Sequence, residues 1–197
     1  MELLREDVVA AAPALLGATL VRGVMSARIV ETEAYRGDDD PACHAFGKTK
    51  MKNMAIFGEP GRAYIYLNYG MHWMLNVVAH APRSGCAILI RAAVPLSGIE
   101  EMRQNRPVPK DRELLSGPGK LAKAFGISSV ENGTDLFSPV SQGDLHIVPS
   151  QEPPVQVVTG PRIGITEGNW HEVPWRFLDV SALEWVSRPL PPKPHSG

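Results

Sequence analysis

A series of short segments with strand character, separated by glycine and proline turns, constrains the fold of this chain most. Within several of them apolar and polar side chains alternate, which is the two-residue period of a β-strand. The expected strands are residues 19–22, 28–35, 62–67, 71–78, 86–92, 145–148, 155–158, 162–166 and 175–180. Helical signals are confined to residues 8–17, 97–105, 111–115 and 118–126. Because helices do not alternate regularly with strands, the sequence predicts an α+β fold.

A single domain accounts for most of the 197 residues, since this length is typical of one domain. We expect that domain over residues 1–188 and an extended proline-rich tail over residues 189–197. Within the domain, Pro13 interrupts the first helix. Ser97 and Glu100 have the spacing of a capping box at the start of the second helix.

The N-terminal segment and the cysteines indicate a cytoplasmic protein. Residues 8–21 are mostly apolar but too few to span a bilayer. Acidic residues outnumber basic ones in residues 1–7, whereas a signal peptide begins with positive charge. Cys43 and Cys86 form neither a CxxC motif nor a disulfide pattern. We therefore expect a cytoplasmic protein without membrane contact.

The net charge of −1 argues mildly against a nucleic-acid partner, because DNA-binding proteins usually present a basic surface. Basic residues nevertheless concentrate in two parts of the sequence. The first contains Lys48, Lys50, Lys52 and Arg62, and the second contains Arg103, Arg106, Lys110, Arg112 and Lys120. Each run fits either a solvated surface, which composition favours, or part of a DNA-binding face.

Two carboxylates and a tyrosine share one face of the strand expected at residues 28–35. Alternation places Ile29, Glu31, Glu33 and Tyr35 together on that face, and His44 follows in the next loop. A carboxylate there can activate water and stabilise positive charge that develops on a sugar. The aromatic rings can enclose a flat base. The same pattern also fits a charged strand face with a tyrosine in the core.

The turn NYG (68–70) joins the third and fourth expected strands. A large aromatic residue such as Tyr69 on an exposed turn suits a wedge that enters the DNA base stack and replaces a flipped nucleotide. With a three-residue loop, we expect Tyr66 to pair with His72 and Asn76 to project on the same face. The alternative is an edge hairpin stabilised by aromatic cross-strand pairs.

Taken together, these segments resemble the alkyladenine (3-methyladenine) DNA glycosylase family over most of the chain. The matching stretches are RIVETEAY (28–35), ACH (42–44), YIYLNYGM (64–71) continuing to Asn76, LIRA (89–92) and DRELLSGPGKL (111–121). Their combined order and spacing are specific, whereas each piece alone is not. The resemblance implies a single α+β domain with a curved, mainly antiparallel sheet, surrounding helices and a protruding β-hairpin that intercalates into DNA.

The resemblance also implies roles for particular residues. Glu33 would be the general base for the attacking water, which Arg91 helps to position. The implied base pocket contains Tyr35, His44, Tyr66, Asn76 and Leu89. Within it, Asn76 would exclude guanine by a clash with the 2-amino group. Tyr69 would intercalate, supported by Met71.

Two further features accompany these assignments. At the start of the last expected helix, Gly117, Gly119 and Lys120 are expected to contact phosphate. His72 and Trp73 stand where members of the family carry other aromatic residues, and Trp73 either reshapes the pocket or packs behind it.

The expected function is base excision repair of duplex DNA by a monofunctional glycosylase. Its substrates would be alkylated or deaminated purines: 3-methyladenine, 7-methylguanine, hypoxanthine and ethenoadenine. Damaged bases cost less to flip because they pair poorly, and cationic bases are attracted to aromatic faces. Lyase chemistry needs an amine nucleophile, and the matched catalytic stretches contain no lysine. We therefore expect hydrolysis without a lyase step. We also expect the protein to be a monomer and to use no cofactor and no metal.

Two other functions fit parts of the sequence. A non-catalytic module that binds damaged DNA would keep the pocket and the wedge but would have no use for Glu33. A metal-dependent hydrolase would use Glu31, Glu33, the aspartates at 38–40 and His44 as ligands, although their spacing matches no standard metal-binding motif.

Overall fold

A computed structural model describes residues 2–48, 54–80, 84–138, 144–152 and 156–190. The strands are β1 (Thr19–Arg22), β2 (Met25–Arg36), β3 (Ala63–Asn68), β4 (His72–Ala79), β5 (Cys86–Ser97), β6 (His146–Val148), β7 (Val157–Gly160) and β8 (Arg176–Asp179). The α-helices are α1 (Val8–Ala11), α2 (Ile99–Asn105), α3 (Asp111–Leu114) and α4 (Pro118–Ala124). The 3-10 helices are η1 (Glu2–Arg5), η2 (Ala12–Leu15), η3 (Gly37–Asp39), η4 (Ala55–Phe57), η5 (Ser129–Glu131) and η6 (Val180–Trp185). Lys50, Lys52, Val155 and most of the expected tail lie outside the described residues.

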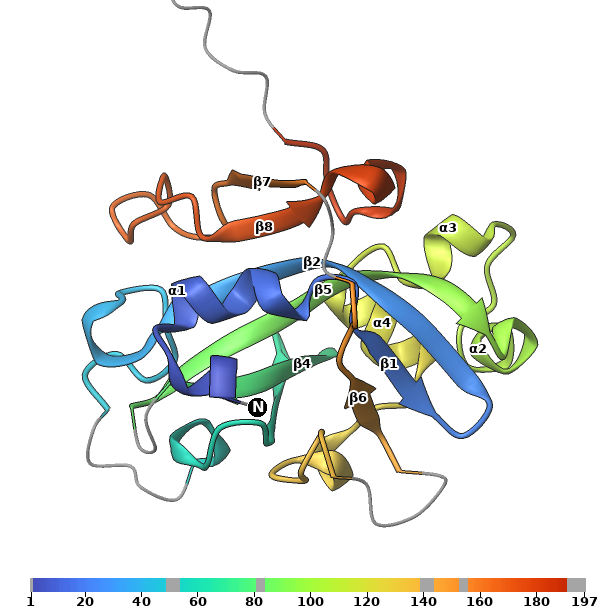
Figure 1. The fold of residues 1–197 in the computed structure, drawn as a ribbon, viewed down its shortest axis with the longest axis horizontal. Coiled ribbons are helices and arrows are strands. Elements are labelled where there is room, and N and C mark those ends of the chain that lie inside the picture. The colour runs from blue at the N-terminus through green and yellow to red at the C-terminus, as the bar shows by residue number, and fades with distance from the viewer. Residues whose placement is uncertain (1, 49–53, 81–83, 139–143, 153–155, 191–197) are drawn as a thin grey trace, which may run out of the picture.

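The strands form one curled sheet in the order β3-β4-β5-β2-β1-β6, and β8 also pairs with β2 and carries β7. Every strand pairing in the described residues is antiparallel. Helix α1 lies along β2 and β5, while α2, α3 and α4 gather toward the opposite end of the molecule (Figure 1). The predicted α+β class and the curved antiparallel sheet are confirmed.

The central strands separate a main core from a second face of the sheet. Their core-facing side chains include Ala63, Ile65, Leu75, Val77, Ile88 and Ile90. The intervening residues belong to a smaller cluster or to a pocket and include Tyr64, Tyr66, Met74, Asn76, Leu89 and Arg91. Period-two alternation therefore gives each strand one apolar side for stability and one side on which a site can form.

A pair of β-bulges changes this alternation in β2 and β5. The register passes from Ile29 opposite Ala93 to Glu31 opposite Ala92, which leaves Val30 as an extra residue. Ile29 therefore packs in the main core, and its predicted place beside Glu31 was wrong. The next shift leaves Arg91 as the extra residue of β5. Bulges often redirect side chains next to functional sites, and this one turns Arg91 toward the carboxylates of β2.

Pro13 divides the helix expected at residues 8–17. The α-helix ends at Ala11, and the chain continues as a 3-10 helix in which Pro13 occupies an early position. The reason is that proline has no N–H to donate and its ring clashes with the preceding turn.

Two other local expectations were wrong. Residues 162–166 form a loop rather than a strand, and Gly164 has a φ of 76° that no extended strand adopts. Ser97 does not cap α2, because it extends β5 and its hydroxyl lies 2.7 Å from that of Ser26. Gly98 occupies the N-cap position instead. Among the described residues, no helix combines the length and apolar character needed to cross a membrane.

Candidate active site

Strand register aligns four side chains in one row across the sheet. Tyr64 pairs with Asn76 across β3 and β4, and Asn76 pairs with Leu89 across β4 and β5. Leu89 in turn pairs with Glu33 across β5 and β2. Directly opposed residues of antiparallel strands project to the same face, so residues distant in the sequence meet here.

Glu33 is fully buried at one end of this row, and both of its carboxylate oxygens are occupied. The hydroxyl of Tyr35 donates to Oε2 at 2.9 Å, and Nη1 of Arg91 donates to the same oxygen at 3.1 Å. The backbone N–H of Ile163 donates to Oε1 at 2.7 Å. These three donors compensate the loss of water around the buried charge. The donor residues line a pocket, whereas Glu33 lies directly behind them.

A second carboxylate balances the charge around Arg91. Nε of Arg91 donates to Oε1 of Glu31 at 3.2 Å, and Nε of Arg176 donates to the same oxygen at 2.6 Å. Ser187 donates its backbone N–H to Oε2 of Glu31 at 2.6 Å. Burial alone would lower the pKa of Arg91, but attraction by Glu33 and Glu31 outweighs it and raises that pKa. Two carboxylates and two guanidinium groups thus form a compact, charge-balanced cluster.

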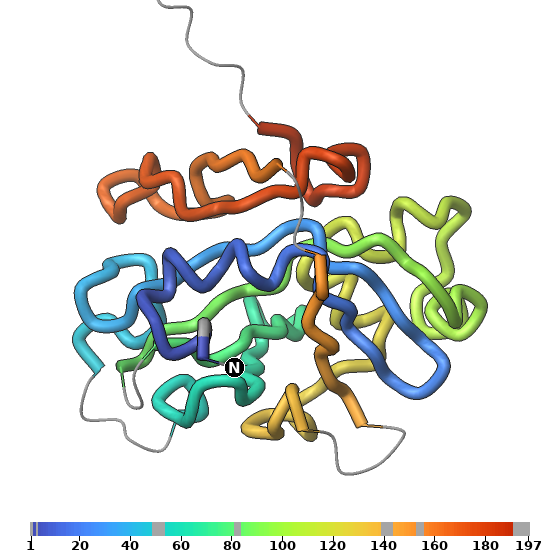
Figure 2. Tube along the Cα trace, in the orientation of Figure 1, coloured from blue at the N-terminus to red at the C-terminus, as the bar shows by residue number. Residues whose placement is uncertain are grey.

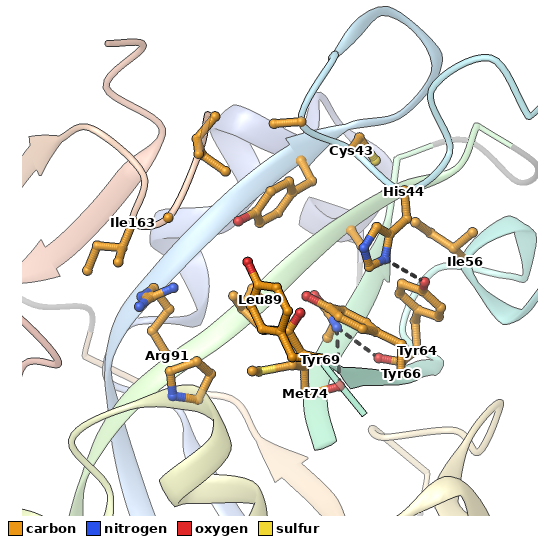
Figure 3. A pocket seen from close by; sticks show the side chains of 18 residues that line it. Cys43, His44, Ile56, Tyr64, Tyr66, Tyr69, Met74, Leu89, Arg91 and Ile163 are labelled. Carbon is orange, nitrogen blue, oxygen red and sulfur yellow. Dashed lines mark hydrogen bonds between the residues drawn. The ribbon is translucent and has the colours of Figure 1, made fainter. Parts of the chain in front are cut away.

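A pocket of about 390 Å³ lies in front of this cluster (Figure 3). All five residues expected in the base pocket line it, namely Tyr35, His44, Tyr66, Asn76 and Leu89, and so do Arg91 and Tyr69. Arg91 and Ile163 lie on one side, and His44 and Tyr64 lie on the opposite side (Figure 3). The volume is within the usual range for small-molecule sites, roughly 300–1,000 Å³, and suits one nucleobase.

Three phenol groups of the pocket, those of Tyr35, Tyr64 and Tyr66, stay protonated at neutral pH. Burial raises the pKa of Tyr66 to about 12 and also raises the pKa of Tyr64. Burial, followed by the negative charge of Glu33, raises the pKa of Tyr35 well above its ordinary value. Their hydroxyls can therefore donate hydrogen bonds, and their rings present uncharged aromatic faces to a ligand.

His44 is held in place by Tyr64, to which sequence reasoning assigned no role. The distance from His44 Nδ1 to the Tyr64 hydroxyl oxygen is 3.0 Å. The His44 ring also packs edge-on against Tyr66, with ring centroids 4.2 Å apart. Burial, and secondarily the charge of Lys48, lower the pKa of His44. His44 is therefore neutral at neutral pH and does not repel a cationic ligand.

The lowered pKa of His44 predicts a pH-dependent loss of stability. The unfolded chain takes up a proton at this residue near pH 6.5, while the folded chain resists protonation to lower pH. The contribution of neutral His44 is thus fully present above pH 6.5 and is lost as the pH falls through the folded-state pKa. In urea unfolding across this range, wild-type protein should lose more stability than His44→Gln. Parallel pH profiles for the two proteins would contradict this prediction.

The loop between β3 and β4 consists of Tyr69, Gly70 and Met71, because Asn68 pairs with His72. The predicted pairing of Tyr66 with His72 was wrong: Tyr66 pairs with Met74, and Asn76 still shares its face. The loop has the expected three residues but begins one residue later than the expected turn at residues 68–70, so Asn68 extends β3 and lies opposite His72. At the tip, Tyr69 is 84% exposed and Met71 is 71% exposed. Tyr69 also has a φ of 48°, which is uncommon for a residue with a side chain.

The start of α4 lies beside this hairpin, and Pro118 lines the pocket. A Cβ atom on Gly119 would lie 3.0 Å from the Cβ of His72, so glycine permits the close approach of helix and strand. Lys120 is exposed, and its Nζ lies 3.3 Å from the Ser116 hydroxyl. Trp73 packs against the main core and does not line the pocket, which decides between its two predicted positions.

The proposed metal ligands are engaged with other groups. Asp40 forms a two-pronged ion pair with Arg162, and Glu31 binds Arg91 and Arg176. In the described ranges, no three His, Cys, Asp or Glu side chains gather in an arrangement suited to a metal ion. These contacts argue against the metal-dependent alternative.

Sequence reasoning missed several residues that support the site. The contribution of Arg162 and Ile163 to the site was not predicted, because their segment was expected to be a strand. Arg176 and Ser187 come from the C-terminal part of the domain, and nothing in their local sequence indicates a contact with Glu31. Tyr64 was recoverable, because alternation places it on the same strand face as Tyr66.

Comparison with known proteins identifies the relatives of this chain. The family profile described as methylpurine-DNA glycosylase matches residues 2–182. A protein of Nitrosospira multiformis is 44% identical over 179 residues, covering 91% of this chain and 88% of the relative. A protein of Rhodopseudomonas palustris strain HaA2 is 48% identical, covering 91% and 85%, and one of Rubrobacter xylanophilus is 44% identical, covering 93% and 92%. All three carry the name "Putative 3-methyladenine DNA glycosylase". The chain therefore belongs to the methylpurine-DNA glycosylase family.

Proposed function

We propose that this protein is a DNA glycosylase of base excision repair that hydrolyses the N-glycosidic bond of methylated purines, 3-methyladenine in particular. The observation that carries the proposal is the position of Glu33. Its carboxylate lies behind an aromatic pocket and is contacted by Tyr35 and Arg91, both of which line that pocket. The names of the family and of the relatives support the same reaction.

The proposed reaction assigns Glu33 the role of general base. Departure of the base leaves positive charge on the sugar, and a buried carboxylate nearby stabilises that charge and takes a proton from the attacking water. Water that enters between Tyr35 and Arg91 would reach Oε2, the oxygen that both residues contact. Arg91 would then orient the water while Glu31 holds the guanidinium in position.

Recognition would depend on charge and shape. The rings of Tyr35 and Tyr66 would enclose the flipped base, and an aromatic face attracts a cation by roughly 0.5–2 kcal/mol. Neutral His44 adds no opposing charge. Purines methylated at N3 or N7 are flat and cationic, so both their shape and their charge suit this pocket. Their positive charge also makes them good leaving groups. Hypoxanthine and ethenoadenine are proposed as further, neutral substrates.

Tyr69 and Lys120 are proposed as contacts to the DNA around the flipped nucleotide. The exposed ring of Tyr69 would fill the gap left by the flipped nucleotide, supported by Met71. Lys120, with Gly117 and Gly119, would contact phosphate at the start of α4. No lysine lines the described pocket, which supports hydrolysis without a Schiff-base lyase step.

Asn76 is the proposed specificity residue. Its side-chain Nδ2 donates to the carbonyl oxygens of Tyr64 and Met74 at 3.0 and 3.3 Å, so the amide is held rigidly in the pocket wall. Asn76→Ala should raise excision of guanine-derived bases relative to adenine-derived bases by about tenfold, because the clash with the 2-amino group is removed. Competition assays with 7-methylguanine and 3-methyladenine measure this ratio, and an unchanged ratio would contradict the assignment.

A panel of duplex oligonucleotides tests the function. Each duplex carries 3-methyladenine, hypoxanthine, ethenoadenine or no lesion, and both released base and alkali-labile abasic sites are quantified without added metal. Release of 3-methyladenine is the expected result, and release from the other lesions defines the substrate range. Tight binding of lesions without release of any base would instead indicate a non-catalytic damage-binding module.

A further inference from the structure

A buried ion pair joins two loops that come from distant parts of the sequence. Arg162, in the loop between β7 and β8, donates from Nη1 and Nη2 to the two carboxylate oxygens of Asp40, at 2.5 and 3.0 Å. Asp40 lies in the loop that follows β2, and both side chains are completely buried. The two loops lie at the same end of the molecule (Figure 2).

Asp40 organises the loop that leads to His44. Its carboxylate accepts the backbone N–H groups of Arg36 and Ala42 at 3.1 and 3.0 Å. Its carbonyl oxygen accepts the N–H of Cys43 at 2.8 Å. Ala42, Cys43 and His44 form one wall of the pocket, so the position of this wall depends on Asp40.

Arg162 organises the region around Glu33 from the other side. Its Nη1 donates to the carbonyl oxygen of Ala34 at 3.1 Å, and its guanidinium lies 4.8 Å from the ring centroid of Tyr35. The next residue, Ile163, donates its N–H to Glu33. Arg162 itself does not line the pocket, whereas Ile163 does. It therefore acts on Glu33 only through neighbouring groups.

The ion pair is a costly way to fill this space. Buried pairs often add little net stability compared with apolar residues of the same size. Within the described residues, Nε of Arg162 is also the buried side-chain atom without a hydrogen-bond partner, which is a further cost. Unlike apolar residues, the pair makes a contact of defined geometry. The two-pronged hydrogen bonding fixes the position of each loop relative to the other.

We propose that Asp40 and Arg162 form a positioning pair, which fixes the spacing of the two pocket walls and keeps the Ile163 N–H and Tyr35 directed at Glu33. This inference rests on the proposed function of Glu33 as general base. The charged or titratable side chains around Glu33 are Tyr35 and Arg91 in direct contact, with Glu31 and Tyr66 nearby.

Asp40→Asn and Arg162→Lys test the pair. Asparagine keeps the size of the side chain but removes its charge, and lysine keeps the charge but loses the two-pronged geometry. Both variants should lower the single-turnover rate constant by about 10–100-fold, because small displacements of catalytic groups have effects of this size. Affinity for undamaged duplex should stay at the wild-type value, since neither residue lies in the proposed DNA contacts.

Glu131→Gln is the matched control, because it breaks a partly buried ion pair with Arg22 and neither residue lines the pocket. Hydrogen exchange of residues 36–44 and 161–165 should become faster in Asp40→Asn and stay unchanged in Glu131→Gln. Folded Asp40→Asn with wild-type rate and exchange would overturn the proposal. The proposal would also be overturned if Glu131→Gln lowered the single-turnover rate constant as much as Asp40→Asn does, after both are corrected for the folded fraction.

The exchange measurement also separates this inference from the proposed function. If wild-type protein releases no base, the glycosylase proposal fails, and exchange alone decides on the positioning pair. Faster exchange in both loops would then support the pair, and unchanged exchange in either loop would overturn it.

Discussion

Glu33→Gln should lower the single-turnover rate of methylpurine excision by about 10²–10⁴-fold, the usual contribution of a positioned general base. Glutamine keeps the shape of the side chain and can still accept the hydrogen bond from Ile163. It cannot take a proton from water or neutralise positive charge on the sugar. The rate is measured with protein in excess over a duplex that carries one lesion.

Binding separates a loss of chemistry from a loss of structure in this variant. Glu33→Gln should bind the lesion duplex with nearly wild-type affinity, because Glu33 does not line the pocket. Glu131→Gln serves as the control for removal of a buried carboxylate elsewhere. Excision by Glu33→Gln at the wild-type rate would rule out the general-base assignment.

Arg91→Met should destabilise the fold by about 3–5 kcal/mol, the usual effect of removing one partner of a buried ion pair. The Arg91 side chain is only 8% exposed and lies between two fully buried carboxylates. Glu31 would retain Arg176, but Glu33 would keep no cation among its described partners. Urea unfolding of the variant and of wild-type protein measures the difference.

A double variant shows whether the unpaired charge causes this loss. Adding Glu33→Gln to Arg91→Met removes the stranded carboxylate, so it should restore on the order of 1–3 kcal/mol relative to Arg91→Met alone. Simple addition of the two single effects would contradict the direct contact between Glu33 and Arg91.

The alternation of side chains made much of the site predictable. It placed Glu33 and Tyr35 on one strand face. For Tyr66 and Asn76, which belong to different strands, the shared face also required the expected hairpin, and it holds although Tyr66 pairs with Met74 instead of His72. Arg91 was predicted as a site residue only from the family resemblance, because no local sequence pattern marks it as functional. The structure brings these residues together because register aligns the faces of β3, β4, β5 and β2.

The remaining features depend on tertiary contacts that one sequence does not reveal. The bulge at Val30 places Ile29 in the core. One extra residue in a strand turns the side chains before it to the opposite face from the one that simple alternation predicts. The loop at Arg162 resembled a strand in composition, although the positive φ of Gly164 prevents one. Its contact with Asp40 spans most of the chain, and nothing local to either residue specifies that pairing.

Mass spectrometry of both products tests hydrolysis by this protein most directly. Wild-type protein is incubated with a dimethyl sulfate-treated duplex in excess EDTA, and the free bases and the DNA strands are analysed separately. The expected products are free 3-methyladenine and an unbroken strand in which a hydroxyl group replaces the base. An unchanged duplex that the protein binds tightly would contradict the glycosylase reaction, and a strand cleaved at the abasic site would contradict hydrolysis without lyase activity.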